Sequence, residues 1–123
     1  MTRILIIEDD EEIAQLLHRV CEAEGWQPEV APDGLEGLIR LGTGDIDLVL
    51  LDLMMPDVSG LRVLQQLFEE GGGSLDVPVI VVTGSAVGAD SAREVLDPAD
   101  VFQKPFDVDE LVGRIRTILE GDE

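Results

Sequence analysis

The chain has few basic residues and almost no lysine. Lysine and arginine together number 8 against 27 aspartates and glutamates, and Lys104 is the single lysine. The formal net charge is therefore −19 at pH 7. Nucleic acid backbones are bound through lysine and arginine, so this balance excludes nucleic acid as a direct ligand. We expect partners that bring positive charge, either cations or proteins with basic patches.

A long apolar run and an N-terminal signal are also missing. No stretch approaches the roughly 18 apolar residues of a membrane span. The N-terminal segment carries an acidic cluster at positions 8–12 instead of the layout of a secretory signal. The one cysteine, Cys21, cannot form a disulfide within the chain, and we interpret it as a packed thiol on a helix face. These absences predict a cytoplasmic protein with no membrane contact.

Aromatic residues are scarce, at 3% of 123 residues, and tyrosine is absent. The hydrophobic content of 45% is nevertheless sufficient for one globular domain, with a core built from leucine, isoleucine and valine. We expect a single domain over residues 1–123. Because only four residues follow Leu119, we expect no effector domain in this chain.

Short β-branched runs alternate with segments of helical periodicity along the chain. The runs predict strands at 3–8, 26–31, 47–52, 78–83 and 100–103, and the second contains Pro28, which favours an edge position. Apolar residues at helical spacing predict helices between these strands and at 108–119, with a weakly amphipathic one at 85–96. Five strands alternating with five helices predict an α/β fold in which a parallel sheet is covered on both faces.

Polar side chains stand at the ends of four predicted strands. They are Glu8 and Asp9, then Asp52, Thr83 and Lys104. In an open parallel sheet, ligands bind beyond the carboxyl ends of the strands. Carboxylates gathered there repel by roughly 4 kcal/mol per pair at about 4 Å, so a positive partner is expected among them. Oxygen ligands of this kind suit Mg²⁺, and an aspartate can act as a nucleophile toward phosphorus.

Four segments in this order resemble the receiver domain of two-component response regulators. They are ILIIEDDEEI, DLVLLDLMMPDVSG, VPVIVVTGSA and KPF, and the likeness runs from Arg3 to Leu119. The resemblance implies a flavodoxin-like fold, a (βα)5 three-layer sandwich whose parallel sheet has the strand order 2-1-3-4-5.

The resemblance also implies a metal site beside a phosphoacceptor. Asp52 matches the phosphoacceptor of the family. Mg²⁺ would be held by Asp52, by Asp9 directly, by Glu8 more often through water, and by the backbone carbonyl of Met54.

The resemblance assigns a second group of residues to the response. Thr83 matches the switch hydroxyl and Lys104 the partner of the phosphoryl group, and a cis peptide bond is implied before Pro105. The family often carries tyrosine or phenylalanine where this chain has Val101, with Phe102 next to it. An aromatic switch at position 101 is therefore not expected.

A function and its partners follow from the resemblance. A sensor histidine kinase or a phosphotransfer protein would donate a phosphoryl group to Asp52, and the chain would catalyse its own phosphorylation and dephosphorylation without being a free-standing enzyme. A downstream protein would read the change at the face of the fourth helix, fifth strand and fifth helix, with a phosphorylation-dependent homodimer as one form of that contact. His18 is predicted to be a solvated side chain, so the donor histidine belongs to another protein.

Two alternatives remain open at this stage. A pseudo-receiver would keep the fold and bind proteins without phosphorylation, and Val101 is the one feature that favours it. A Mg²⁺-dependent phosphohydrolase would use the same nucleophile but usually needs a second acid two residues later, where this chain has Met54.

Overall fold

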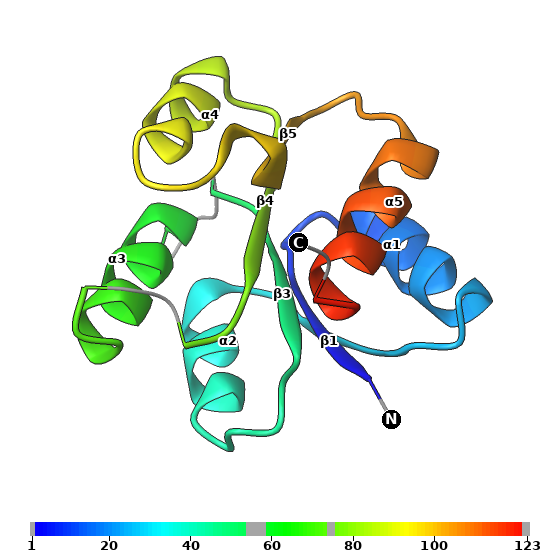
Figure 1. Ribbon diagram of the computed structural model, residues 1–123, viewed down its shortest axis with the longest axis horizontal. Helices are drawn as coiled ribbons and strands as arrows, with labels where there is room; N and C mark the ends of the chain where they lie inside the picture. Colours follow the sequence, from blue (N-terminus) through cyan, green and yellow to red (C-terminus); the bar gives the residue numbers. More distant parts are fainter. Residues whose placement is uncertain (1, 54–58, 74–75, 122–123) are drawn as a thin grey trace.

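The computed structural model describes residues 2–53, 59–73 and 76–121 as a sheet covered by helices (Figure 1). In chain order the elements are β1 (Arg3–Ile7), α1 (Glu11–Ala23), β2 (Gln27–Ala31), α2 (Gly34–Leu41), β3 (Leu48–Leu51), α3 (Gly60–Glu70), β4 (Val79–Thr83), α4 (Ala86–Arg93), η1 (Pro98–Asp100), β5 (Val101–Gln103) and α5 (Val108–Leu119). The alternation of strands and helices is the predicted one, and the observed bounds lie within about three residues of those predicted.

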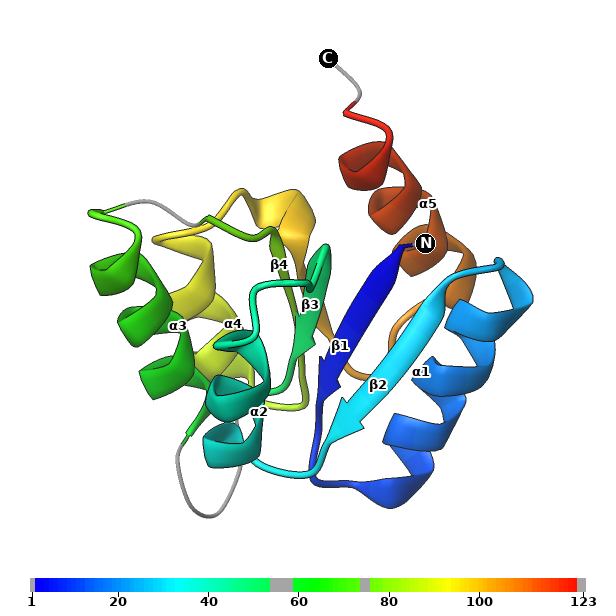
Figure 2. The same ribbon diagram turned by 90° about the horizontal axis from the view of Figure 1, so that it is seen from below.

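The sheet is parallel throughout and has the strand order β2-β1-β3-β4-β5. This confirms the predicted flavodoxin-like fold, and it places β2, which contains Pro28, at an edge, where Figure 2 shows it beside β1. The register pairs Ile7 of β1 with Leu51 of β3, and Leu51 with Val81 of β4. The carboxyl ends of the three central strands therefore lie side by side, which brings the residues that follow them together.

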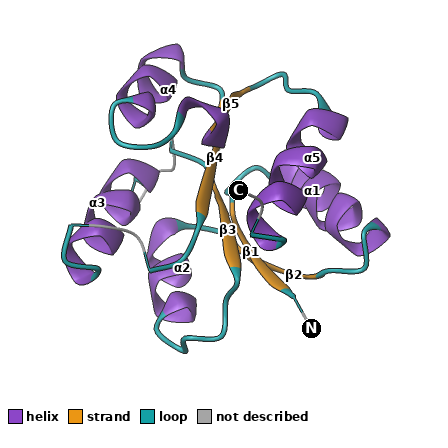
Figure 3. Ribbon diagram, viewed as in Figure 1, coloured by secondary structure: helices purple, strands orange, loops and turns teal. Residues whose placement is uncertain are grey.

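Helices cover both faces of the sheet and enclose two apolar cores. Helices α2, α3 and α4 lie on one face, and α1 and α5 lie on the other (Figures 1 and 3). Alternate strand residues contribute to the two cores. Leu5 and Leu51 pack on the side of α2, α3 and α4, whereas Ile4 and Leu50 pack on the side of α1 and α5. Because both faces are buried, the central strands read as continuous apolar runs.

Side-chain caps begin the five α-helices of the described residues. Each capping oxygen accepts a backbone N–H from the first turn, and the caps are Asp10, Asp33, Ser59, Ser85 and Asp107. The acids at positions 10 and 107 are thus accounted for by helix initiation. Within the described part of the chain, none of the helices has the length and apolar character that crossing a bilayer requires.

Cys21 lies in the core on the α1 side of the sheet and is fully buried. Burial raises the pKa of its thiol to about 12, so the thiol stays protonated at physiological pH. This confirms the interpretation of Cys21 as a packing residue.

Gly60 opens α3 directly behind the end of β3. Its N–H donates to the carbonyl of Leu53 at 3.1 Å. A Cβ added at Gly60 would lie 1.9 Å from the carbonyl oxygen of Asp52, so this close approach of helix and strand requires glycine.

We expect Gly60→Ala to lower the free energy of unfolding by about 3 kcal/mol or more, because the backbone must move to relieve the overlap. Urea denaturation measures the change. Gly113→Ala in α5 is the matched control, since no other part of the described chain comes within 4 Å of the added Cβ. That variant should gain roughly 0.5–1 kcal/mol, as alanine does over glycine in a helix interior. Similar losses in both variants would contradict this account of Gly60.

Candidate functional site

The polar residues predicted at the strand ends do meet at one edge of the sheet. The N–H of Asp52 donates to the carbonyl of Ile7 at 3.0 Å, and the N–H of Lys104 donates to the carbonyl of Thr83 at 2.7 Å. These bonds extend the strand pairing by one residue beyond β3 and β5. They fix the backbones of Asp52 and Lys104 next to the neighbouring strands.

Three carboxylates converge at this edge. One oxygen from each of Glu8, Asp9 and Asp52 lies within 4.8 Å of the others. Glu8 and Asp52 are 3% and 5% exposed, whereas Asp9 is exposed to solvent. A pair of charges at 4.8 Å repels by roughly 3 kcal/mol at an effective dielectric constant near 20.

These donors fit a hard divalent cation. All three offer oxygen, and the exposed side of the cluster leaves room for water and a substrate oxygen, as Mg²⁺ requires. The predicted fourth ligand, the carbonyl of Met54, lies outside the described residues.

Lys104 is paired with Glu8. Its Nζ donates to Oε1 of Glu8 at 2.9 Å, and the two side chains are 21% and 2% exposed. The second oxygen of Glu8 accepts the N–H of Asp10 at 3.2 Å. The sequence placed Lys104 at this edge, but it did not indicate which carboxylate the ammonium would contact.

Thr83 lies at the end of β4 and is fully buried. Its hydroxyl oxygen accepts the N–H of Ser85 at 3.1 Å, and the Ser85 hydroxyl in turn accepts the N–H of Gly88 in α4 at 2.9 Å. An accepting hydroxyl keeps a proton that it can donate. Thr83 thus links the sheet edge to the first turn of α4.

The acidic site forms a shallow depression on the surface. It is lined by Glu8, Asp9, Asp10, Asp52, Gly84, Ser85 and Lys104. Asp10 and Gly84 were not predicted as site residues. Their positions in the sequence could have indicated them, because Asp10 directly follows the acidic pair and Gly84 directly follows Thr83.

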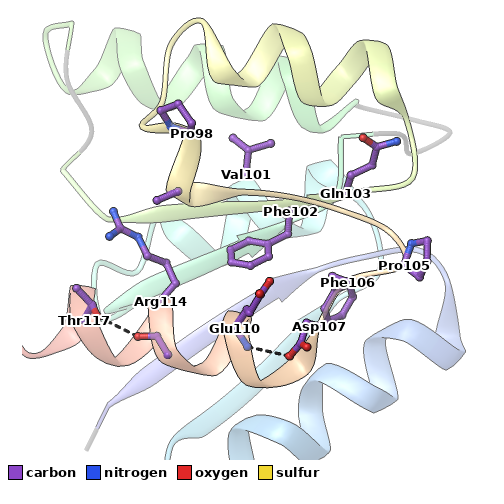
Figure 4. A pocket seen from close by; sticks show the side chains of 12 residues that line it. Pro98, Val101, Phe102, Gln103, Pro105, Phe106, Asp107, Glu110, Arg114 and Thr117 are labelled. Carbon is purple, nitrogen blue, oxygen red and sulfur yellow. Dashed lines mark hydrogen bonds between the residues drawn. The ribbon is translucent and has the colours of Figure 1, made fainter.

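The last two predicted site residues, Val101 and Pro105, lie close to Lys104 in the chain. The peptide bond between Lys104 and Pro105 is cis, as predicted. Val101 is buried on the α4 side of the sheet, whereas Phe102 packs on the opposite side, toward α5 (Figure 4). The aromatic side chain of β5 therefore faces away from α4.

Burial raises the pKa of Glu8 to about 7 from the ordinary value of 4.5. The hydrogen bond from Lys104 opposes this net shift, and the charge of Asp52 contributes to it. Since the folded chain holds this proton more tightly than the unfolded chain does, Glu8 contributes stability that is complete below pH 4.5 and is lost as the pH rises to about 7.

In a buffer without divalent cations, we expect the free energy of unfolding to fall between pH 5 and pH 8 by on the order of 1 to 3 kcal/mol through Glu8. Denaturant titrations at several pH values measure this slope. Glu8→Gln should flatten it, because the amide does not titrate. A slope that is the same in both proteins would assign the effect to other groups.

Curated relatives match nearly the whole chain. The family model of the response regulator receiver domain matches residues 4–116. The transcriptional regulatory protein DltR of Streptococcus agalactiae is 39% identical over 115 residues, which cover 93% of this chain and 50% of DltR. The response regulator ArlR of Staphylococcus saprophyticus is 34% identical over 120 residues, covering 97% and 53%. The chain thus spans about half the length of these relatives.

Solved receiver structures have the same fold. The receiver domain of the Francisella response regulator 1452 has a TM-score of 0.85 at 28% identity, with both chains covered completely. The response regulator TrrA of Thermotoga maritima, solved in complex with Mg²⁺-BeF, has a TM-score of 0.83 at 31% identity over 97% of this chain and 100% of TrrA. Together with the family match and the observed strand order, these similarities establish that the chain belongs to the response regulator receiver domain family of two-component systems.

Proposed function

We propose that this chain accepts a phosphoryl group on Asp52 from the phosphohistidine of a sensor kinase or phosphotransfer protein. The observation that carries the proposal is the convergence of three carboxylates with Lys104 and Thr83 at the carboxyl edge of the sheet. The repulsion within such a group of carboxylates destabilises a fold. Its presence therefore supports a site at which a cation offsets the negative charge.

The transfer is a displacement at phosphorus. A carboxylate oxygen of Asp52 forms the new oxygen–phosphorus bond as the phosphorus–nitrogen bond of the donor breaks. The electron pair of the broken bond stays on the imidazole nitrogen of the donor. The product on this chain is an aspartyl phosphate.

Lys104 and Thr83 hold the phosphoryl oxygens in this proposal. An ammonium has three N–H donors, so Lys104 can keep its bond to Glu8 and still donate to a phosphoryl oxygen. Thr83 supplies a hydroxyl donor from the neighbouring strand.

Mg²⁺ bound by Glu8, Asp9 and Asp52, with the carbonyl of Met54 as the expected fourth ligand, would neutralise charge on the transferring group. The chain's own contribution is to present these oxygens already in place.

The phosphorylated state would be read at the face made by α4, β5 and α5. Thr83 is hydrogen-bonded to Ser85, which caps α4, and Lys104 directly follows the last residue of β5. Thr83 and Lys104 therefore both link the site to this face. We propose that a downstream protein, or a second phosphorylated copy of the chain, binds there inside the cell. The chain would promote its own phosphorylation and dephosphorylation.

Incubation with a small phosphodonor and Mg²⁺, followed by intact mass measurement, tests the proposal. We expect the mass of one added phosphoryl group, and we expect chelation of the cation to prevent the addition. An unchanged mass across a wide range of donor and Mg²⁺ concentrations would leave the chain as a binding module with the receiver fold.

A further inference from the structure

A surface groove runs between β5 and α5, on the side of the sheet away from α4 (Figure 4). Its floor includes the rings of Phe102 and Phe106, each partly exposed. The α5 side of the groove is formed by Glu110, Gly113 and Arg114. The acidic site described above does not use these side chains.

Gly113 is the residue of this groove that folding does not explain. It lies in the interior of α5, where glycine weakens a helix, and it is exposed. A Cβ at this position would meet nothing within 4 Å in the described chain. Its backbone conformation is ordinary, because the residues with a positive φ lie elsewhere among the described positions. The missing side chain therefore leaves the wall of the groove open without any benefit to the fold.

The charged groups of the groove that a ligand can reach are mainly carboxylates. Nε of Arg114 donates to Asp100 at 2.6 Å, and the same guanidinium lies 3.9 Å from Asp97, so its charge is engaged within the chain. Asp107 and Glu110 are exposed carboxylates on the groove. An aromatic floor beside the exposed carboxylates is an environment that a lysine or arginine side chain can occupy, with its alkyl stem on the rings and its charge near Glu110, since Asp107 also caps α5.

The groove is joined to the acidic site through the main chain. Lys104 places its ammonium against Glu8 in the acidic site. Its two neighbours, Gln103 and Pro105, both line the groove. A shift of the Lys104 backbone on phosphorylation would therefore also move Gln103 and Pro105 in the wall of the groove.

We propose that the groove between β5 and α5 is the docking site for a partner protein segment that presents a lysine or arginine side chain into the space left by Gly113. Resting on the proposed function, we further infer that the state of Asp52 reaches this groove through Gln103, Lys104 and Pro105. This route needs no aromatic side chain at position 101.

A second copy of the chain is a poorer occupant than a basic partner. Two copies would each bring a net charge of −19. The cation of the groove, Arg114, is already paired with its own acids. Charge complementarity therefore favours a partner of opposite sign.

The test is an NMR titration of the isotope-labelled chain with a short capped peptide carrying arginine between leucines, compared with the same peptide carrying neutral citrulline. We expect shifts at the amides of Phe102, Glu110 and Gly113, and binding about tenfold weaker for the citrulline peptide. Equal binding of both peptides, or shifts confined to another face, would overturn the proposal. Signals that broaden with protein concentration before peptide is added would assign the groove to a second copy.

Two variants locate the binding further. Gly113→Leu fills the open wall and should weaken the arginine peptide by about tenfold, while leaving phosphoryl uptake on Asp52 unchanged. Glu110→Gln should weaken it more than Glu36→Gln, which removes the same charge from an exposed position in α2. Unchanged affinity in Gly113→Leu would overturn the assignment of Gly113.

The same titration after treatment with the phosphodonor separates the two proposals. A change in peptide affinity that is absent in Asp52→Asn supports the route through Lys104. Phosphorylation with no change in affinity removes the route but leaves the docking site. If the chain is not phosphorylated at all, the comparison of the arginine and citrulline peptides still tests the docking site independently.

Discussion

Replacing Asp52 with asparagine is expected to abolish phosphoryl uptake and, at the same time, to stabilise the protein when no divalent cation is present. An amide is not a nucleophile toward phosphorus, so uptake should fall by more than about 100-fold. The gain in stability has a separate cause. Asp52 is buried, its carboxylate lies close to those of Glu8 and Asp9, and its charge raises the pKa of Glu8.

The change from carboxylate to amide removes this repulsion while keeping the shape of the side chain. We expect a gain of roughly 1 to 3 kcal/mol in the free energy of unfolding at pH 8 in a chelating buffer. Added Mg²⁺ should reduce the difference between the two proteins, because a cation stabilises the wild-type cluster by binding to the folded state.

Asp76→Asn is the matched control for this substitution, because Asp76 is an exposed acid outside the site. It should change neither phosphoryl uptake nor stability by more than about 0.5 kcal/mol. The account of a repelling cluster would be wrong if Asp52→Asn destabilised the chain in the chelating buffer.

The second large effect is expected from Lys104→Met, which removes the ammonium from Glu8 but keeps a similar apolar stem. Removing one partner from a buried ion pair leaves the other charge unpaired, at a cost of about 3–5 kcal/mol when both are fully buried. Because the side chain of Lys104 is 21% exposed, we expect a loss of about 2 to 4 kcal/mol at pH 8. The lost hydrogen bond should also raise the pKa of Glu8 further.

A double-mutant cycle with Glu8→Gln isolates the pair. In the Glu8→Gln background, Lys104→Met should cost less than about 1 kcal/mol, since the carboxylate charge that the ammonium contacts directly is gone. Arg116→Met controls for the loss of a cation from an acidic chain, because Arg116 pairs with Glu24 at the surface. Additive losses in the two backgrounds would show that Lys104 stabilises the fold by some other contact.

The positions of the strands and the location of the site at their carboxyl ends could be predicted because they depend on features that a sequence carries directly. Short apolar runs marked the central strands, and the acids at positions 8, 9 and 52 followed immediately. The carboxyl ends of parallel strands share one edge of the sheet, and the resemblance to the receiver family implied the strand order that makes β1, β3 and β4 neighbours. The caps at Asp10 and Asp107 were predictable for the same reason, since they act within one turn.

The pairing of Lys104 with Glu8 could not be predicted, because it depends on side-chain reach across strands that are far apart in the chain. Three carboxylates were candidates at that edge, and their order in the sequence does not rank them. The same limit applies to the groove beside α5. The sequence shows a glycine inside a helix at position 113, but only the structure shows that Gly113 and Phe102 of β5 line the same groove.

Helix α2 is an example of a pattern that predicted the element but not its buried face. Leu35, Leu38 and Ile39 indicated a helix; Leu38 packs against the core, but Leu35 and Ile39 are 54% and 61% exposed. The helix packs through Leu38 and Leu41, which lie against the core, and through Gly37, where an added Cβ would lie 2.5 Å from Ile7. Close approach at Gly37 thus acts together with these two leucines to set how the helix lies on the sheet.

Locating the phosphoryl group on the chain is the measurement that tests the central claim most directly. The chain is treated with a small phosphodonor and Mg²⁺, digested at mildly acidic pH and mapped by tandem mass spectrometry. We predict a single modified peptide that carries the group on Asp52 and releases it to hydroxylamine, as an acyl phosphate does. Modification of His18 or of a serine or threonine instead, with Asp52 unmodified, would contradict the proposal.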